Sequence, residues 1–121
     1  MPGDLLSRPL IEIAQALRDK EVTAQELVEA AIDRHKRFGE KLHAYSQWAP
    51  EQARLITQAA DAAFAAGVTV GPLQGIPVSI KDLFAASGYP CFAGSSRRLP
   101  ADPWEQDGPP ISFRRDLLGV Y

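Results

Sequence analysis

Residues 71–82 of the chain read GPLQGIPVSIKD, a turn rich in glycine and proline that passes into a short apolar run. Ile76, Val78 and Ile80 occupy every second position, which is the period of a β-strand, and their branched side chains favour extended backbone. The same alternation places Ser79 and Lys81 together on the opposite face. The pattern predicts a strand over residues 78–80.

Lys81 ends this run and is followed at once by an acid, Asp82. One interpretation is a solvated surface lysine. The other is a general base, which must be neutral. Because free lysine has a pKa of about 10.4, a dry or positively charged environment would have to lower that value, at a cost of several kcal/mol. A rigid strand end inside a protein can supply such an environment, whereas a flexible loop cannot.

The stretch at residues 71–82 resembles the G-P-L-x-G-I-P-x-x-[IV]-K-D block of the amidase signature family. Members of that family hydrolyse or transfer carboxamides, and they include general bacterial amidases and the A subunit of transamidating amidotransferases. The resemblance implies that Lys81 is the lysine of a Ser–cis-Ser–Lys triad, in which it acts through a cis serine to activate a nucleophilic serine. It also implies an α/β fold, of which this chain would hold the N-terminal helices and the first strand or strands, and would therefore be mostly helical.

The composition is that of an ordinary globular protein, with 121 residues, 45% of them hydrophobic and 23% charged. A formal net charge of −2 without a basic patch argues against nucleic-acid binding. The sequence contains no run of about 18 apolar residues, so no membrane span is expected. The N-terminus does not resemble a signal peptide. Cys91 is the single cysteine, which excludes an internal disulfide and suits a reducing cytoplasm.

Three helices are predicted before the strand, over residues 9–20, 23–38 and 50–66. The second begins at a capping box, in which Thr23 and Glu26 each satisfy a free backbone donor of the other. The third is rich in alanine, which has the highest helix propensity. Helices two and three are expected to pack together through Leu27, Ala31, Ile56 and Phe64.

Other nucleophiles are the weaker interpretation. Ser95 and Ser96 follow Gly94 but precede two arginines, so they resemble a structural G-S segment of the family rather than its glycine-rich serine loop. Ser79 lies about 6.6–7 Å from Lys81 along a strand, too far for a direct hydrogen bond. Cys91 could pair with His43 or His35, yet a buried, inert cysteine is favoured.

No cofactor or metal is expected. His35 lies at the edge of an apolar helix face, and no second histidine, cysteine or acid stands beside it at the spacing of a metal site. It is therefore interpreted as a partly buried structural residue. In the complete family the partner is a small-molecule amide, and a cytoplasmic location is expected.

Residues 1–109 follow the N-terminal part of an amidase signature domain, whereas residues 110–121 depart from its pattern. A natural truncation and a shift of reading frame near Pro110 both explain the departure. The resemblance implies that the two serines of the triad lie many tens of residues beyond the lysine, while this chain ends at Tyr121. Two functions stay open: an amidase represented by a piece that is inactive alone, with Lys81 exposed, or a non-catalytic remnant, scaffold or binding module.

Overall fold

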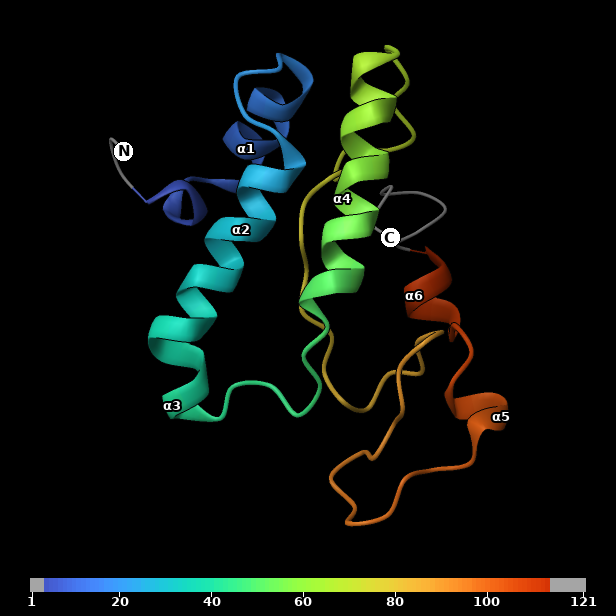
Figure 1. Cartoon of the computed structure of the whole chain (residues 1–121). Coiled ribbons are helices and arrows are strands. Elements are labelled where there is room, and N and C mark those ends of the chain that lie inside the picture. Colours follow the sequence, from blue (N-terminus) through green and yellow to red (C-terminus); the bar gives the residue numbers. More distant parts are fainter. Residues whose placement is uncertain (1–3, 114–121) are drawn as a thin grey trace.

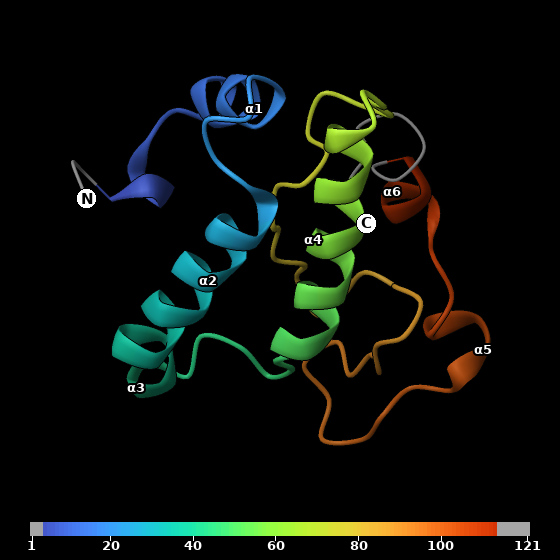
Figure 2. The same cartoon turned by 45° about the horizontal axis from the view of Figure 1, so that its top comes forward.

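The computed structural model describes residues 4–113 and is built of helices joined by long irregular segments (Figure 1). Helices α2 and α4 run side by side in opposite directions, and α1 lies across one end of the pair (Figures 1 and 2). In this part of the chain no helix combines the length and apolar character that a membrane span requires. The elements in order are η1 (Leu5–Ser7), α1 (Leu10–Arg18), α2 (Ala24–Arg34), the π-helical turn η2 (His35–Gly39), α3 (Glu40–Leu42), α4 (Pro50–Ala65), α5 (Ala101–Trp104) and α6 (Pro109–Phe113).

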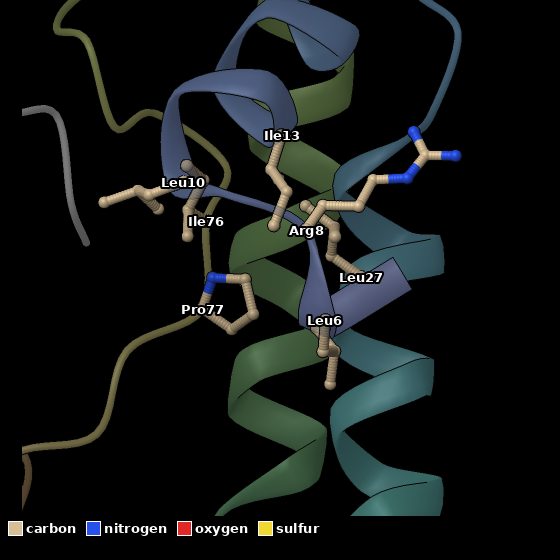
Figure 3. Close-up of a pocket in the computed structure, with 7 residues that line it drawn as sticks. All are labelled: Leu6, Arg8, Leu10, Ile13, Leu27, Ile76 and Pro77. Carbon is tan, nitrogen blue, oxygen red and sulfur yellow. The ribbon is translucent and has the colours of Figure 1, made fainter. Parts of the chain in front are cut away.

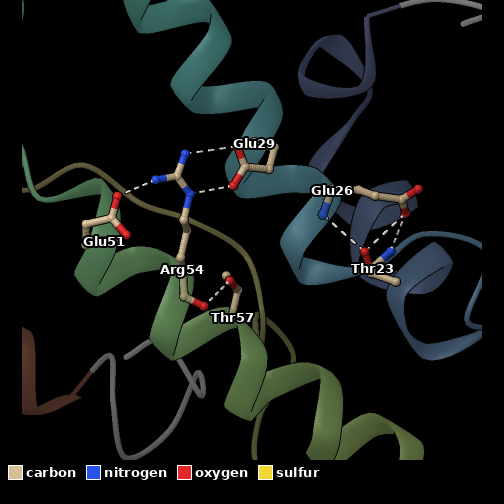
Figure 4. A network of polar contacts seen from close by, with 6 residues as sticks. All are labelled: Thr23, Glu26, Glu29, Glu51, Arg54 and Thr57. Atoms are coloured by element: carbon tan, nitrogen blue, oxygen red, sulfur yellow. Dashed lines mark hydrogen bonds and ion pairs between the residues drawn. The ribbon is translucent and has the colours of Figure 1, made fainter.

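All three predicted helices are confirmed as α1, α2 and α4. The capping box begins α2: the Glu26 backbone N–H donates to Thr23 Oγ1 at 3.1 Å, and the Thr23 N–H donates to Glu26 Oε2 at 2.8 Å (Figure 4). Helix α2 ends at Arg34, and η2 continues its path to Gly39. Pro50 occupies the first turn of α4, where its missing N–H removes no helical bond.

Side chains of α4 hold the start of α2 in place. Both carboxylate oxygens of Asp61 accept hydrogen bonds from α2, from Ala24 N at 2.7 Å and from Gln25 N at 3.1 Å. The carboxylate also sits at the positive end of the α2 dipole. About one turn further along α2, Glu29 Oε1 accepts a hydrogen bond from Arg54 Nε at 2.6 Å (Figure 4). The Arg54 guanidinium holds the pKa of Glu29 below its usual range. Both ends of the Arg54–Glu29 pair are partly exposed, so the Asp61 cap contributes more to the contact between the helices.

The core lies where α1, α2 and the end of α4 meet. Leu27 and Phe64 belong to it, as predicted, while Ala31 and Ile56 are half-buried. Ile76, from the segment that follows α4, packs against the same cluster. The buried members are Leu5, Ile13, Ala16, Leu17, Val22, Ala24, Leu27 and Phe64.

The predicted strand over residues 78–80 is wrong. That segment has no regular structure, and no strand occurs anywhere within residues 4–113. Val78 and Ile80 are 45% and 37% exposed, so of the three alternating apolar residues only Ile76 packs against the core. The physical reason is that a strand needs a hydrogen-bonding neighbour, and the described residues contain none. The α/β class is therefore not seen here, and the described part is helical.

The second predicted unit, residues 110–121, coincides only in part with the described residues. Its first four residues belong to α6, which begins at Pro109. Residues 114–121 lie outside the part of the chain that the structure describes.

Candidate active site

The GPLQGIP turn is held tightly against the helices. Gly75 has φ of +80°, and a Cβ atom placed there would lie 3.1 Å from Phe64 Cε2 and 3.2 Å from the Ala24 side chain. Only glycine combines that backbone conformation with so close an approach. The next residue, Ile76, packs against the core. The close contact at Gly75 therefore fixes the position from which the chain continues towards Lys81.

Replacement of Gly75 by alanine is expected to lower the free energy of unfolding by about 2–3 kcal/mol, because it adds a steric clash to the strain of a positive φ. Gly67→Ala is the matched control. Gly67 also has a positive φ, +74°, but nothing lies within 4 Å of its added Cβ, so about 1 kcal/mol is expected there. Urea unfolding followed by circular dichroism measures both variants. Equal losses of unfolding free energy in the two variants would show that the close approach of Phe64 to residue 75 adds no cost to the substitution.

Gln74 fastens the other side of the turn. Its side chain is 5% exposed, and its amide closes a loop: Val70 N donates to Oε1 at 2.6 Å, and Nε2 donates to the Val68 carbonyl at 3.2 Å. Both halves of the buried amide are thereby paired, as burial requires. Arg18 adds a longer bond of 3.5 Å to the Pro72 carbonyl. The turn is therefore fixed from several directions.

A pocket of about 270 Å³ lies where this turn meets η1 and α1 (Figure 3). The side chains of Ile13, Leu27 and Ile76 line it, together with the ring of Pro77. The Arg8 guanidinium points away from these apolar groups (Figure 3). The pocket thus offers no polar group that could activate a substrate, and we assign it no chemistry.

Lys81 follows the fixed turn by a few residues and is solvent-exposed. Its carbonyl accepts from Leu83 N at 2.8 Å and from Phe84 N at 3.1 Å, which makes a tight turn. Asp82 Oδ1 accepts from Phe92 N at 3.1 Å, so the acid beside Lys81 positions the backbone. Within residues 4–113 no ion pair joins Lys81 to Asp82 or to any other acid. Hydrogen bonds to its backbone carbonyl hold Lys81 in position, while the residue itself is exposed to solvent.

None of the other nucleophiles weighed from the sequence is joined to Lys81 by a hydrogen bond in the described residues. Ser79 is exposed beside it. Ser95 Oγ accepts from Arg97 N at 3.1 Å in an exposed turn, which fits a structural role. Cys91 is 2% exposed, and its carbonyl accepts from Leu99 N at 2.8 Å. Cys91 is therefore buried, as predicted, while its lack of reactivity stays a prediction.

His35 lies in an aromatic cluster beyond the end of α2. Its ring stacks on Trp48 with centroids 4.0 Å apart, and it meets Tyr45 edge-on at 5.4 Å. Its Nδ1 atom is buried and has no hydrogen-bond partner. The described residues contain no group of three or more His, Cys, Asp or Glu arranged to hold a metal ion.

Two structural residues of this region were not foreseen from the sequence. Gln74 is part of the quoted block, yet nothing in its spacing indicates that its amide closes the loop to Val68 and Val70. Asp61 caps a helix that begins 37 residues earlier in the chain. Capping patterns are recognised within about four residues of a helix start, so a cap from another helix carries no local signal.

Comparison with known proteins gives a consistent result. The family model described as Amidase matches residues 26–106. The chain is 39% identical over 111 residues to a 2-amino-5-chloromuconic acid deaminase of Comamonas testosteroni, covering 92% of this chain and 24% of that protein. It is 45% identical over 86 residues to the A subunit of the glutamyl-tRNA(Gln) amidotransferase of Rhizobium etli, covering 71% of this chain and 17% of that protein.

The corresponding protein of Acidothermus cellulolyticus is 36% identical over 93 residues, which cover 77% of this chain and 18% of that protein. No solved structure matches the chain. The chain thus spans about a quarter of the deaminase's length and less than a fifth of the lengths of these amidotransferase proteins. Since the family match covers most of the sequence and contains the whole block at residues 71–82, the chain belongs to the amidase family.

Proposed function

We propose that this chain supplies the general base of a site that cleaves or transfers amide C–N bonds, and that Lys81 is that base. The observation that carries the proposal is the fixed turn: Gly75 and Gln74 hold residues 71–77 against the helices, and Lys81 follows four residues later. The relatives support the chemistry, since the deaminase and the amidotransferases are both named for reactions at carbon–nitrogen bonds.

The reaction follows the Ser–cis-Ser–Lys scheme that the resemblance implies. Neutral Lys81 Nζ accepts a proton from the cis serine, which in turn takes the proton of the nucleophilic serine. That serine attacks the amide carbon, the C–N bond breaks as the nitrogen gains a proton, and an acyl-enzyme forms. Water or a second amine then releases the acyl group.

The exposed position of Lys81 sets a condition on this proposal. Water stabilises the charged amine, and a base must be neutral, so the site requires protein that covers Lys81 and excludes water. The two serines and the oxyanion donors then belong to that covering protein, outside the described residues. Oxyanion donors commonly supply the largest part of the rate enhancement.

Residues 1–121 alone are therefore expected to show no amide turnover above that of their Lys81→Ala variant. A base without its nucleophile cannot form an acyl-enzyme. The measurement is ammonia release from simple aliphatic and aromatic amides by both purified proteins. Turnover that disappears in the variant would contradict this expectation, because Ser79, Ser95, Ser96 or Cys91 would then be acting as the nucleophile.

A further inference from the structure

A short stretch of backbone between the fixed turn and Lys81 has free hydrogen-bonding groups. The turn ends with the bond that Ile76 N donates, and the next backbone bonds are those accepted by the Lys81 carbonyl. Within residues 4–113 no hydrogen bond involves the backbone N–H or carbonyl of Val78 or Ile80. Both residues are exposed, in a stretch without helix, turn or bend. Such a stretch offers its backbone to another chain, as the open edge of a sheet does.

Pro77 decides which edge of this stretch can pair. In antiparallel pairing, the N–H and C=O groups of alternate residues point towards the partner. One edge of the stretch therefore presents Pro77, Ser79 and Lys81, and the other presents Val78 and Ile80. Proline has no N–H, so it is tolerated where its nitrogen points away from the partner. The edge formed by Val78 and Ile80 keeps all of its donors and acceptors.

This edge is complementary to itself. In an antiparallel pair centred on Ser79, Val78 lies opposite Ile80 of the second copy, and Ile80 lies opposite Val78 of the second copy. The residues of each such pair exchange two N–H···O=C bonds. Their branched side chains share one face and contact each other across the pair. Each copy thus supplies the backbone groups and the apolar side chains that the other copy lacks.

Other registers are less favourable. A pair centred on Ile80 places the apolar Val78 opposite the charged Asp82 of the second copy. A pair centred between two residues places apolar side chains opposite polar ones, because it opposes odd and even positions. In the first register, Lys81 lies opposite Pro77 of the second copy, so the two lysines do not face each other and their repulsion is avoided.

We propose that residues 77–81 pair with the same residues of a second copy of this chain, antiparallel and about a two-fold axis at Ser79. The two copies use the same surface, so the contact closes on itself and stops at a dimer. Because the paired segment is short, the dimer is weak and depends on chain concentration. This association goes beyond the function proposed for Lys81 and requires no catalytic activity.

Sedimentation equilibrium of the full chain measures the association. The mean mass is expected to rise from 13.2 kDa towards twice that value as the chain concentration approaches about 1 mM, the Kd of a weak complex. Ile80→Pro removes a pairing N–H and should hold the mass at the monomer value. Ile80→Thr keeps that N–H and a branched side chain, so it should still dimerise. Circular dichroism checks that both variants keep the helices.

Disulfide cross-linking tests the register. With Cys91 replaced by alanine, Ser79→Cys places one thiol directly opposite its copy. Residues in such a non-hydrogen-bonded pair have Cα atoms about 4.5 Å apart, which a disulfide can bridge. The control is Ser96→Cys in the same background, at an exposed serine outside the segment. Oxidation should link Ser79→Cys chains roughly tenfold faster or more, because pairing raises the effective concentration of the thiols.

Four results would overturn the inference: a mass that stays at 13.2 kDa up to about 1 mM, assemblies larger than a dimer, Ile80→Pro associating like the parent, or equal cross-linking rates for Ser79→Cys and Ser96→Cys. A chain that stays monomeric would leave this segment to a different partner, such as the protein that covers Lys81. Association is measured without turnover, so either outcome leaves the role of Lys81 to be decided by activity.

Discussion

An amidase chimera that carries this chain's segment is expected to lose about 100- to 10,000-fold of its kcat/KM when Lys81 is replaced by alanine, the range for loss of a general base. In the chimera, the segment of the Comamonas testosteroni deaminase that aligns with this chain over 111 residues is replaced by the corresponding residues of this chain. If Lys81 is the base, the remainder of the deaminase is expected to cover it and to exclude water from the amine, which would make its basicity available to the reaction.

The matched control is Lys41→Ala, at another exposed lysine, in α3. This variant should keep the activity of the parent chimera, and thermal unfolding should show that both variants fold. A Lys81→Ala chimera as active as its parent would remove Lys81 from catalysis. A folded parent chimera without activity would also count against the proposal, and would favour the non-catalytic scaffold.

The largest expected effect on stability belongs to Leu27→Ala, at about 3–5 kcal/mol of lost unfolding free energy. The Leu27 side chain is 0% exposed and lies in the core cluster between α1, α2 and α4. Truncation removes its apolar contacts and leaves a cavity within the core cluster. A small domain is stable by only about 5–15 kcal/mol, so this loss is a large fraction of the total.

Leu55→Ala is the control for Leu27→Ala, because it makes the same chemical change at a leucine of α4 that is 61% exposed. Its expected cost is within about 0.5 kcal/mol, as for most surface substitutions. Urea denaturation followed by far-UV circular dichroism compares the two variants. Similar midpoints for both would mean that Leu27 does not lie in a packed core.

The sequence by itself determined the three longest helices of the described residues, α1, α2 and α4. Thr23 and Glu26 form the capping box that their spacing predicts, and alanines and Pro50 define α4. These features act between residues within a few positions of one another, so they can be identified from a single sequence. The same holds for the block at residues 71–82, whose glycines and prolines form a turn and whose residues carry the resemblance to the amidase family.

The tertiary structure decided what depends on distant partners. Val78 and Ile80 alternate as a strand would, but strand formation requires a neighbouring backbone, which no periodicity in one segment can guarantee. Asp61 caps a helix that begins 37 residues earlier, and Gly75 is required because Phe64 and Ala24 approach it. The hydrogen bond from Ser87 N to Asp107 Oδ1 likewise joins two segments that lie 20 residues apart in the chain. Such contacts arise from the packing of whole segments, so they leave no pattern within any one stretch of the sequence.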